Sequence, residues 1–118
     1  MLLLVDDNDQ MRQLIRSLVA DLADNILECS DGAEAIVIYG EHQPDWVLMD
    51  IKMKQVDGLA ATRQIKAAYP EAKIVIVTNF DDRKMREAAC EAGAVEFVAK
   101  DNLLDVRHLL AKTRCAGP

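Results

Sequence analysis

The sequence has few cysteines and no long apolar run, and both shortages exclude classes of protein. Cys29, Cys90 and Cys115 are its three cysteines, and their odd number and wide spacing predict neither a disulfide framework nor a zinc knuckle. Free thiols of this kind suit a reducing compartment, so we expect a cytoplasmic protein. No apolar run approaches the roughly 18–20 residues of a membrane-spanning helix, and the run from Met1 to Val5 is too short for the core of a signal peptide. We therefore expect no association with membranes.

Basic residues are also in short supply. The 118 residues include 14 Lys plus Arg against 20 Asp plus Glu, which leaves a formal net charge of −6. Because a phosphate backbone selects for Lys and Arg, this balance argues against binding nucleic acid unaided. Low-complexity stretches, linkers and internal repeats are absent from the sequence as well. What remains, 51% apolar and 29% charged residues, is typical of one globular domain.

Five short apolar runs alternate with segments that favour helices. The runs are aliphatic or β-branched and lack a period of two, which is typical of strands buried on both faces. They are residues 2–5, 26–29, 46–49, 74–77 and 95–99. The later helices are expected over residues 31–41, 57–69, from 81 or 82 to 93, and 102–112. This alternation predicts an α/β domain with a parallel sheet and right-handed crossovers.

The first helix has the clearest pattern. Asn8 or Asp9 stands where an N-cap is expected. Apolar residues then follow at helical spacing and predict a single stripe packed against the sheet. The stripe consists of Met11, Leu14, Ile15, Leu18, Val19 and Leu22. With five helices distributed over both faces, we expect a flavodoxin-like doubly wound fold with strand order 2-1-3-4-5.

Ionisable and polar residues stand at the carboxyl ends of the predicted strands. Asp6 and Asp7 follow the first strand and Asp50 the third, while Thr78 and Lys100 follow the fourth and fifth. In a parallel sheet these ends share one edge, where ligands bind at the point of reversal in strand order. The expected order therefore brings the three aspartates into one pocket.

The chemistry of this group predicts a site for a phosphoryl group. Three carboxylates a few ångströms apart either raise their pKa values or recruit a cation, and an all-oxygen cluster suits a hard ion such as Mg²⁺, or Mn²⁺. Lys100 would add a positive charge and Thr78 a hydroxyl. One carboxylate could then act as a nucleophile and form an acyl phosphate.

Each of these residues also has a purely structural interpretation. Asp7 could cap a helix, Lys100 could be a solvated surface lysine, and Thr78 is a good strand former. Phe97 would ordinarily belong to the core. The functional hypothesis rests on the combination, because chance seldom places complementary groups on four strand ends.

Taken together, these residues resemble the receiver domain of two-component response regulators, and the likeness covers essentially the whole chain. It is closest to receivers with a helix-turn-helix output of the LuxR/FixJ type. The motifs in order are Leu4-Val5-Asp6-Asp7-Asn8, Val47-Leu48-Met49-Asp50-Ile51-Lys52-Met53 with Asp57-Gly58, Ile76-Val77-Thr78, and Phe97-Val98-Ala99-Lys100. Each is weak alone, and the ordered set is specific.

The resemblance implies a role for each matching residue. Asp50 would be the phosphoacceptor for a sensor histidine kinase. Asp6, Asp7 and Asp50 would hold Mg²⁺, with the backbone carbonyl of Lys52 as a further ligand. Thr78, Asn79 and Lys100 would contact the phosphoryl group, and the bulk of Asn79 would narrow access to it. Thr78 and Phe97 would form the switch that remodels the surface of the fourth helix, fifth strand and fifth helix.

Lys52 and Phe80 would flank the water that attacks the phosphoryl group. Phe80 has no group that can orient a water, so we expect slow self-dephosphorylation. The resemblance implies a signalling switch rather than a conventional enzyme, with transcription controlled through an output domain absent from this chain. DNA would be contacted only through that domain, and a homodimer is a further candidate partner.

Residues 1–113 are expected to form the receiver and 114–118 a tail or the start of a linker. The chain would then be a piece of a longer regulator or a stand-alone receiver. Two other functions stay open: a receiver-like interaction module that works without phosphorylation, and a small phosphatase with an aspartate nucleophile. A flavin carrier is disfavoured, because the acidic residues 6–9 would repel a bound phosphate.

Overall fold

The structure is a computed structural model that describes residues 1–51, 53, 56–79 and 83–115, without the side chains of 112–115. Its five strands form one parallel sheet in the order β2-β1-β3-β4-β5, as the sequence predicts. The strands are β1 (Leu2–Val5), β2 (Ile26–Cys29), β3 (Trp46–Met49), β4 (Ile74–Thr78) and β5 (Glu96–Ala99). The helices are α1 (Asp9–Val19), α2 (Gly32–His42), α3 (Gly58–Ala68), α4 (Arg83–Ala92) and α5 (Leu104–Cys115).

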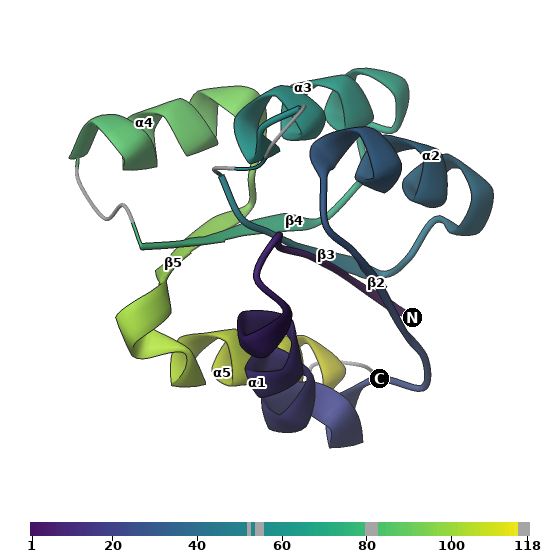
Figure 1. The fold of residues 1–118 in the computed structure, drawn as a ribbon, viewed down its shortest axis with the longest axis vertical. Helices are drawn as coiled ribbons and strands as arrows, with labels where there is room; N and C mark the ends of the chain where they lie inside the picture. The colour runs from purple at the N-terminus through teal and green to yellow at the C-terminus, as the bar shows by residue number, and fades with distance from the viewer. Residues whose placement is uncertain (52, 54–55, 80–82, 116–118) are drawn as a thin grey trace.

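The helices form a layer on each face of the sheet. Figure 1 shows α2, α3 and α4 on one face and α1 and α5 on the other. Successive side chains of a strand point to opposite faces, so Leu3 and Val5 pack under the first layer while Leu2 and Leu4 pack against the second. This confirms the expected doubly wound fold. Among the described residues, no helix is both long and apolar enough to cross a bilayer.

Side-chain caps start three of the helices. The Asn8 side chain accepts a hydrogen bond from the backbone N–H of Met11 (3.0 Å) and begins α1, which decides between the two predicted caps. Asp31 and Asp57 cap α2 and α3 in the same way. Each cap satisfies a backbone N–H that has no partner within its helix. These caps define where each loop at the functional edge of the sheet ends.

The first and last helices differ from their predicted forms. Leu14 is 48% exposed, although it belongs to the predicted apolar stripe, because the stripe is wider than the surface that α1 presents to the sheet. The last helix begins at Leu104 rather than residue 102, since a 3₁₀ turn over Lys100–Asn102 precedes it, and it continues beyond residue 112 to Cys115. The predicted start of the fourth helix, at Asp81 or Asp82, lies outside the described residues.

The last strand is also one residue shorter than predicted. It begins at Glu96, and Val95 is 47% exposed, because β5 is an edge strand that pairs with β4 on one side. The inner strands β1 and β3 are buried almost throughout. The other edge strand, β2, has its predicted bounds, and the inner strand β4 extends one residue beyond them to Thr78.

Candidate functional site: an acidic cluster at the strand ends

The acidic cluster is built by the pairing of β1 with β3. Val5 lies opposite Met49 in this register, so Asp6 and Asp50 leave the sheet side by side. The backbone N–H of Asp50 donates to the Val5 carbonyl oxygen at 2.9 Å and continues the ladder by one residue. Carboxylate oxygens of Asp6, Asp7 and Asp50 all lie within 4.8 Å of one another. The expected convergence of the three aspartates is thus present.

The three carboxylates differ in burial. Asp6 is 3% exposed and Asp50 is 7% exposed, whereas Asp7 is open to solvent. One oxygen of each buried carboxylate accepts a backbone hydrogen bond at 2.9 Å, from Asn8 N–H to Asp6 Oδ1 and from Ile51 N–H to Asp50 Oδ1. These bonds orient both groups and leave their Oδ2 atoms for other partners.

Lys100 occupies the space beside those two free oxygens. Its Nζ atom lies 2.8 Å from Asp6 Oδ2 and 3.3 Å from Asp50 Oδ2. The pairing of β4 with β5 accounts for this position, because Thr78 lies opposite Ala99 and Lys100 follows directly. The Lys100 side chain is 6% exposed, so its interpretation as a solvated surface lysine is wrong.

Burial also affects the ionisation of Asp50. Its pKa is raised, chiefly because removal from water penalises the charged carboxylate, and the negative charge of Asp6 adds to the effect. The Lys100 ammonium and the N–H of Ile51 act in the opposite direction. The cluster therefore holds excess negative charge, since Lys100 contributes one positive charge against three carboxylates.

This donor set fits a hard divalent cation. Three carboxylates on two adjacent strand ends, two of them already oriented by backbone amides, supply the oxygen ligands that Mg²⁺ or Mn²⁺ prefers. The exposure of Asp7 leaves one side of the cluster open to water or an incoming group. The excess negative charge gives a physical reason for a cation to bind there.

Thr78 is the last residue of β4, and Asn79 follows it at the same edge of the sheet as the acidic cluster. Thr78 is fully buried, while Asn79 is exposed. Phe97 lies one strand further along, half-buried, and the Arg86 guanidinium stands 4.8 Å from the centre of its ring. Phe97 is therefore not enclosed in the core, and a side chain from α4 covers part of its ring. Lys52 and Phe80, predicted beside the attacking water, lie outside the described residues.

Two contributors to the site were not identified from the sequence. Arg12 donates to the backbone carbonyl oxygen of Asp6. The buried Asp31 carboxylate accepts from Ala33 N–H at 2.8 Å and from Val56 N–H at 3.3 Å, which ties the start of α2 to the loop before α3. An Asp-Gly pair ahead of a helix was the available signal for Asp31, whereas nothing in the spacing of Arg12 indicates its contact.

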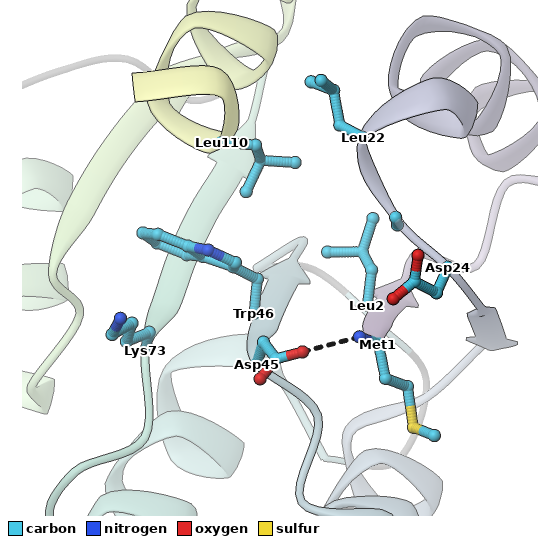
Figure 2. Close-up of a pocket in the computed structure, with 9 residues that line it drawn as sticks. Met1, Leu2, Leu22, Asp24, Asp45, Trp46, Lys73 and Leu110 are labelled. Atoms are coloured by element: carbon cyan, nitrogen blue, oxygen red, sulfur yellow. Dashed lines mark hydrogen bonds and ion pairs between the residues drawn. The ribbon is translucent and has the colours of Figure 1, made fainter. Parts of the chain in front are cut away.

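A separate pocket of about 250 Å³ opens at the opposite edge of the sheet. Figure 2 shows Asp45 beside the N-terminal amine of Met1, an ion pair of 2.6 Å, with Trp46 and Leu110 forming apolar walls. The ionisable side chains that line it are exposed, so they lack the burial and mutual orientation of the acidic cluster. Its lining residues are Met1, Leu2, Leu22, Ala23, Asp24, Asp45, Trp46, Lys73 and Leu110.

The fold and the acidic edge together define the class of protein. Residues 2–114 match the response regulator receiver domain, and the chain belongs to this family. It is therefore a receiver domain of the two-component response regulator type, as the sequence motifs predict. Receivers of this family are signalling switches rather than conventional enzymes.

Particular relatives include both short receivers and longer regulators. The chain is 37% identical over 100 residues to the chemotaxis protein CheY of Bacillus subtilis, covering 84% of this chain and 83% of CheY. It is 34% identical over 114 residues to the response regulator VraR of Staphylococcus aureus, covering 94% of this chain and 54% of VraR. The chain thus spans most of this CheY but about half of VraR.

Solved structures give the same assignment. A LuxR-family DNA-binding response regulator from Staphylococcus aureus superposes with a TM-score of 0.84 at 26% identity, covering 94% of this chain and 95% of that one. A LuxR-family two-component response regulator from Aurantimonas superposes with a TM-score of 0.82 at 31% identity, covering 94% of this chain and 84% of that one. A CheX–CheY–BeF3–Mg complex from Borrelia burgdorferi shares the fold, with a TM-score of 0.86 at 22% identity over 98% and 89%.

Proposed function

We propose that this protein is a phosphoryl-accepting switch in which Asp50 receives a phosphoryl group from a phosphohistidine of a sensor histidine kinase. The observation that carries the proposal is the position of Asp50. Its carboxylate is buried, lies within 4.8 Å of the Asp6 and Asp7 carboxylates, and has the Lys100 ammonium 3.3 Å from Oδ2. A nucleophile, a cation-binding pair and an ammonium at one point suit phosphoryl transfer.

The transfer forms one bond and breaks another. An oxygen of the Asp50 carboxylate attacks the phosphorus atom, the P–N bond of the donor breaks, and its electron pair stays on the imidazole, which takes up a proton. The product is an acyl phosphate. Lys100 lies where its ammonium can pair with a phosphoryl oxygen on Asp50. Thr78 and Asn79, at the neighbouring strand end, are proposed as further phosphoryl contacts.

The acidic cluster would hold the metal ion that this transfer needs. Asp6, Asp7 and Asp50 are the proposed side-chain ligands, and the resemblance adds the backbone carbonyl of Lys52. When bound, Mg²⁺ or Mn²⁺ neutralises charge on the phosphoryl oxygens. The chain's own contribution is to orient two of the carboxylates through backbone hydrogen bonds before the ion arrives.

The output would pass through the surface formed by α4, β5 and α5. Thr78 ends β4, next to the strand that carries Phe97, so a change at the Thr78 hydroxyl has a short route to that ring. The likeness to LuxR-family regulators supports control of transcription by an output domain. The proposed location is the cytoplasm. DNA contact would then belong to that domain, and a homodimer of receivers is a further proposed partner.

Phosphorylation by a small donor tests the proposal directly. We expect acetyl phosphate with Mg²⁺ to add one phosphoryl mass, located by peptide mapping at Asp50, and chelation of the metal to abolish the adduct. Asp50→Asn should give no adduct, whereas Asp24→Asn, which removes an exposed carboxylate at the opposite edge, should react like the parent. An unmodified parent, under conditions that label a control receiver, contradicts the proposal and favours an interaction module that works without phosphate.

The lifetime of the acyl phosphate gives a second test. We expect slow hydrolysis, because Phe80, at the position that flanks the attacking water in the family, has no group to orient it. Phe80→Glu supplies a carboxylate there and should shorten the half-life by roughly tenfold, the low end of general-base effects. The half-life is measured by loss of the phosphoryl mass after removal of the donor. A parent that decays as fast as Phe80→Glu contradicts this expectation.

A further inference from the structure

Arg12 connects three segments around the acidic cluster. Its guanidinium donates to the Asp6 backbone carbonyl at the end of β1 and to the Asp9 carboxylate in the first turn of α1. Its Nε donates to Glu28 Oε1 on the edge strand β2 at 3.1 Å. Glu28 also pairs with Arg16, one turn further along α1. The Arg12 side chain is 15% exposed, and its contact with the Asp6 carbonyl is partly buried, whereas its contacts with Asp9 and Glu28 lie at the surface.

The loop that Arg12 holds carries two of the acidic cluster's carboxylates. Residues 6–8 connect β1 to α1. Regular hydrogen bonds hold only the two ends of this segment, because Asp6 N–H donates to the Cys29 carbonyl on β2 and the Asn8 carbonyl accepts from Arg12 N–H. Within it, the Asn8 N–H bond to Asp6 Oδ1 and the Arg12 bond to the Asp6 carbonyl add two further restraints. A planar guanidinium with several donors can reach three acceptors at once, which a lysine ammonium cannot do with the same geometry.

We infer that Arg12 is a positioning residue for divalent-cation binding, acting through the Asp6 backbone and the Glu28 anchor on β2. The inference rests on the proposed function, since it assigns the cation to Asp6, Asp7 and Asp50. Arg12 does not contact the cation. It fixes the direction in which Asp6 and Asp7 leave the sheet, and therefore the distance between their carboxylates. Outer partners of this kind commonly change metal affinity about 10–100-fold.

The direction in which loss of Arg12 changes the Mg²⁺ affinity distinguishes a positioning role from a purely electrostatic one. Arg12 carries a positive charge close to a site for a cation, so its loss should strengthen Mg²⁺ binding if charge alone matters. If Arg12 positions the ligands, its loss should weaken binding. Arg16 is the matched control, because it bears the same charge, pairs with the same Glu28, is half exposed and makes no contact with Asp6 among its described hydrogen bonds.

Mg²⁺ titration by calorimetry on the full chain tests the inference, using the parent, Arg12→Ala, Arg12→Lys and Arg16→Ala. We expect the dissociation constant to rise about tenfold in Arg12→Ala. Arg12→Lys keeps the charge but lacks the planar guanidinium with its several donors, so it should recover only part of the Mg²⁺ affinity. Arg16→Ala should bind as tightly as the parent or slightly more tightly. Glu28→Gln weakens the contact of Arg12 with β2 but keeps Arg12, so its dissociation constant for Mg²⁺ should lie between those of the parent and Arg12→Ala. This variant replaces Arg12→Ala in the test if Arg12→Ala does not fold.

Amide hydrogen exchange without metal gives an independent readout. We expect the Asn8 N–H, which donates to Asp6 Oδ1, to exchange faster in Arg12→Ala than in the parent and Arg16→Ala, with little change in the strands. Equal or tighter Mg²⁺ binding by Arg12→Ala, or Asn8 exchange unaltered by the substitution, overturns the positioning role while the proposed function stands. A parent that binds no Mg²⁺ overturns both, and only this result bears on the proposed function.

Discussion

Burial gives chemically identical aspartates different properties. Asp6 and Asp50 are nearly inaccessible and face Lys100, whereas Asp24 and Asp45 at the opposite edge are exposed. A buried carboxylate loses hydration that an exposed one keeps, and its neighbours must replace it. For Asp50 the replacement is incomplete, as its raised pKa indicates. The site therefore holds the proposed phosphoacceptor at a cost in stability, which is commonly found where function requires a charge.

Asp50→Asn should consequently stabilise the fold at neutral pH in the absence of metal. A folded-state pKa above the unfolded value favours folding when the carboxyl is protonated, and that contribution is lost as the pH rises through the folded pKa. The asparagine is neutral throughout, so its advantage should be present at pH 7 and should shrink as the pH falls toward 4. We expect a gain of about 1 kcal/mol, the usual size of a single-residue effect on stability.

Urea unfolding in EDTA at several pH values measures this difference. Asp24→Asn, which removes a charge from an exposed side chain, controls for the reduction in net charge. Its stability should stay within about 0.5 kcal/mol of the parent. If Asp50→Asn were less stable than the parent at pH 7, the interpretation of the Asp50 pKa would be wrong.

At the scale of elements, the close approach of α3 to the end of β3 shapes the site. Gly58 begins α3, and its N–H donates to the Ile51 carbonyl at 2.8 Å, so the helix starts against the residue after Asp50. A Cβ at Gly58 would lie 1.9 Å from the Asp50 carbonyl oxygen, which is backbone and has little freedom to move. Arg12 thus contacts the residue after β1, and Gly58 contacts the segment after β3, the neighbouring strand.

Gly58→Ala should therefore destabilise the protein by about 2 kcal/mol or more, as overpacking does, and slow phosphorylation at Asp50. Gly40→Ala is the matched control within α2, where a Cβ meets the Tyr69 hydroxyl at 3.4 Å, ordinary contact distance. There the better helix propensity of alanine should stabilise by about 0.5–1 kcal/mol. Thermal unfolding of both variants and the parent measures the two changes in stability, which should have opposite signs. A Gly58→Ala variant as stable as the parent would contradict the close approach of α3 to β3.

At the scale of the whole molecule, the acidic cluster joins strands from the two halves of the sheet. Asp6 follows β1 and Asp50 follows β3, so a cation bound to both carboxylates would link segments far apart in the sequence. A ligand that binds the folded chain and not the unfolded one adds to the free energy of unfolding. Cation binding and global stability are therefore coupled in this fold.

Mg²⁺ should raise the free energy of unfolding by about 2.7 kcal/mol at 100 times its dissociation constant. EDTA should reverse the gain, and NaCl at equal ionic strength should not reproduce it. Asp6→Asn should lose most of the effect, because it removes a buried carboxylate from the cluster, whereas Asp45→Asn at the opposite edge should retain it. Equal stabilisation of Asp6→Asn and the parent would place the cation elsewhere.

The sequence determined the architecture and the composition of the site. Continuous apolar runs mark strands buried on both faces, and a parallel sheet places the carboxyl ends of its strands at one edge. Asp6, Asp50 and Lys100 could therefore be predicted as neighbours. The inner strands β1 and β3 end where the sequence predicts, because their burial is set by the sheet itself.

Only the tertiary structure decided how each long side chain is used. Burial of Lys100, exposure of Leu14 and the reach of Arg12 to Glu28 depend on what distant segments place around each residue. A periodic pattern records which face of an element is apolar, but it carries no information about the neighbours that surround a flexible side chain. The position of Arg12 beside the acidic cluster comes from the packing of α1 across β1 and β2, which local sequence does not encode.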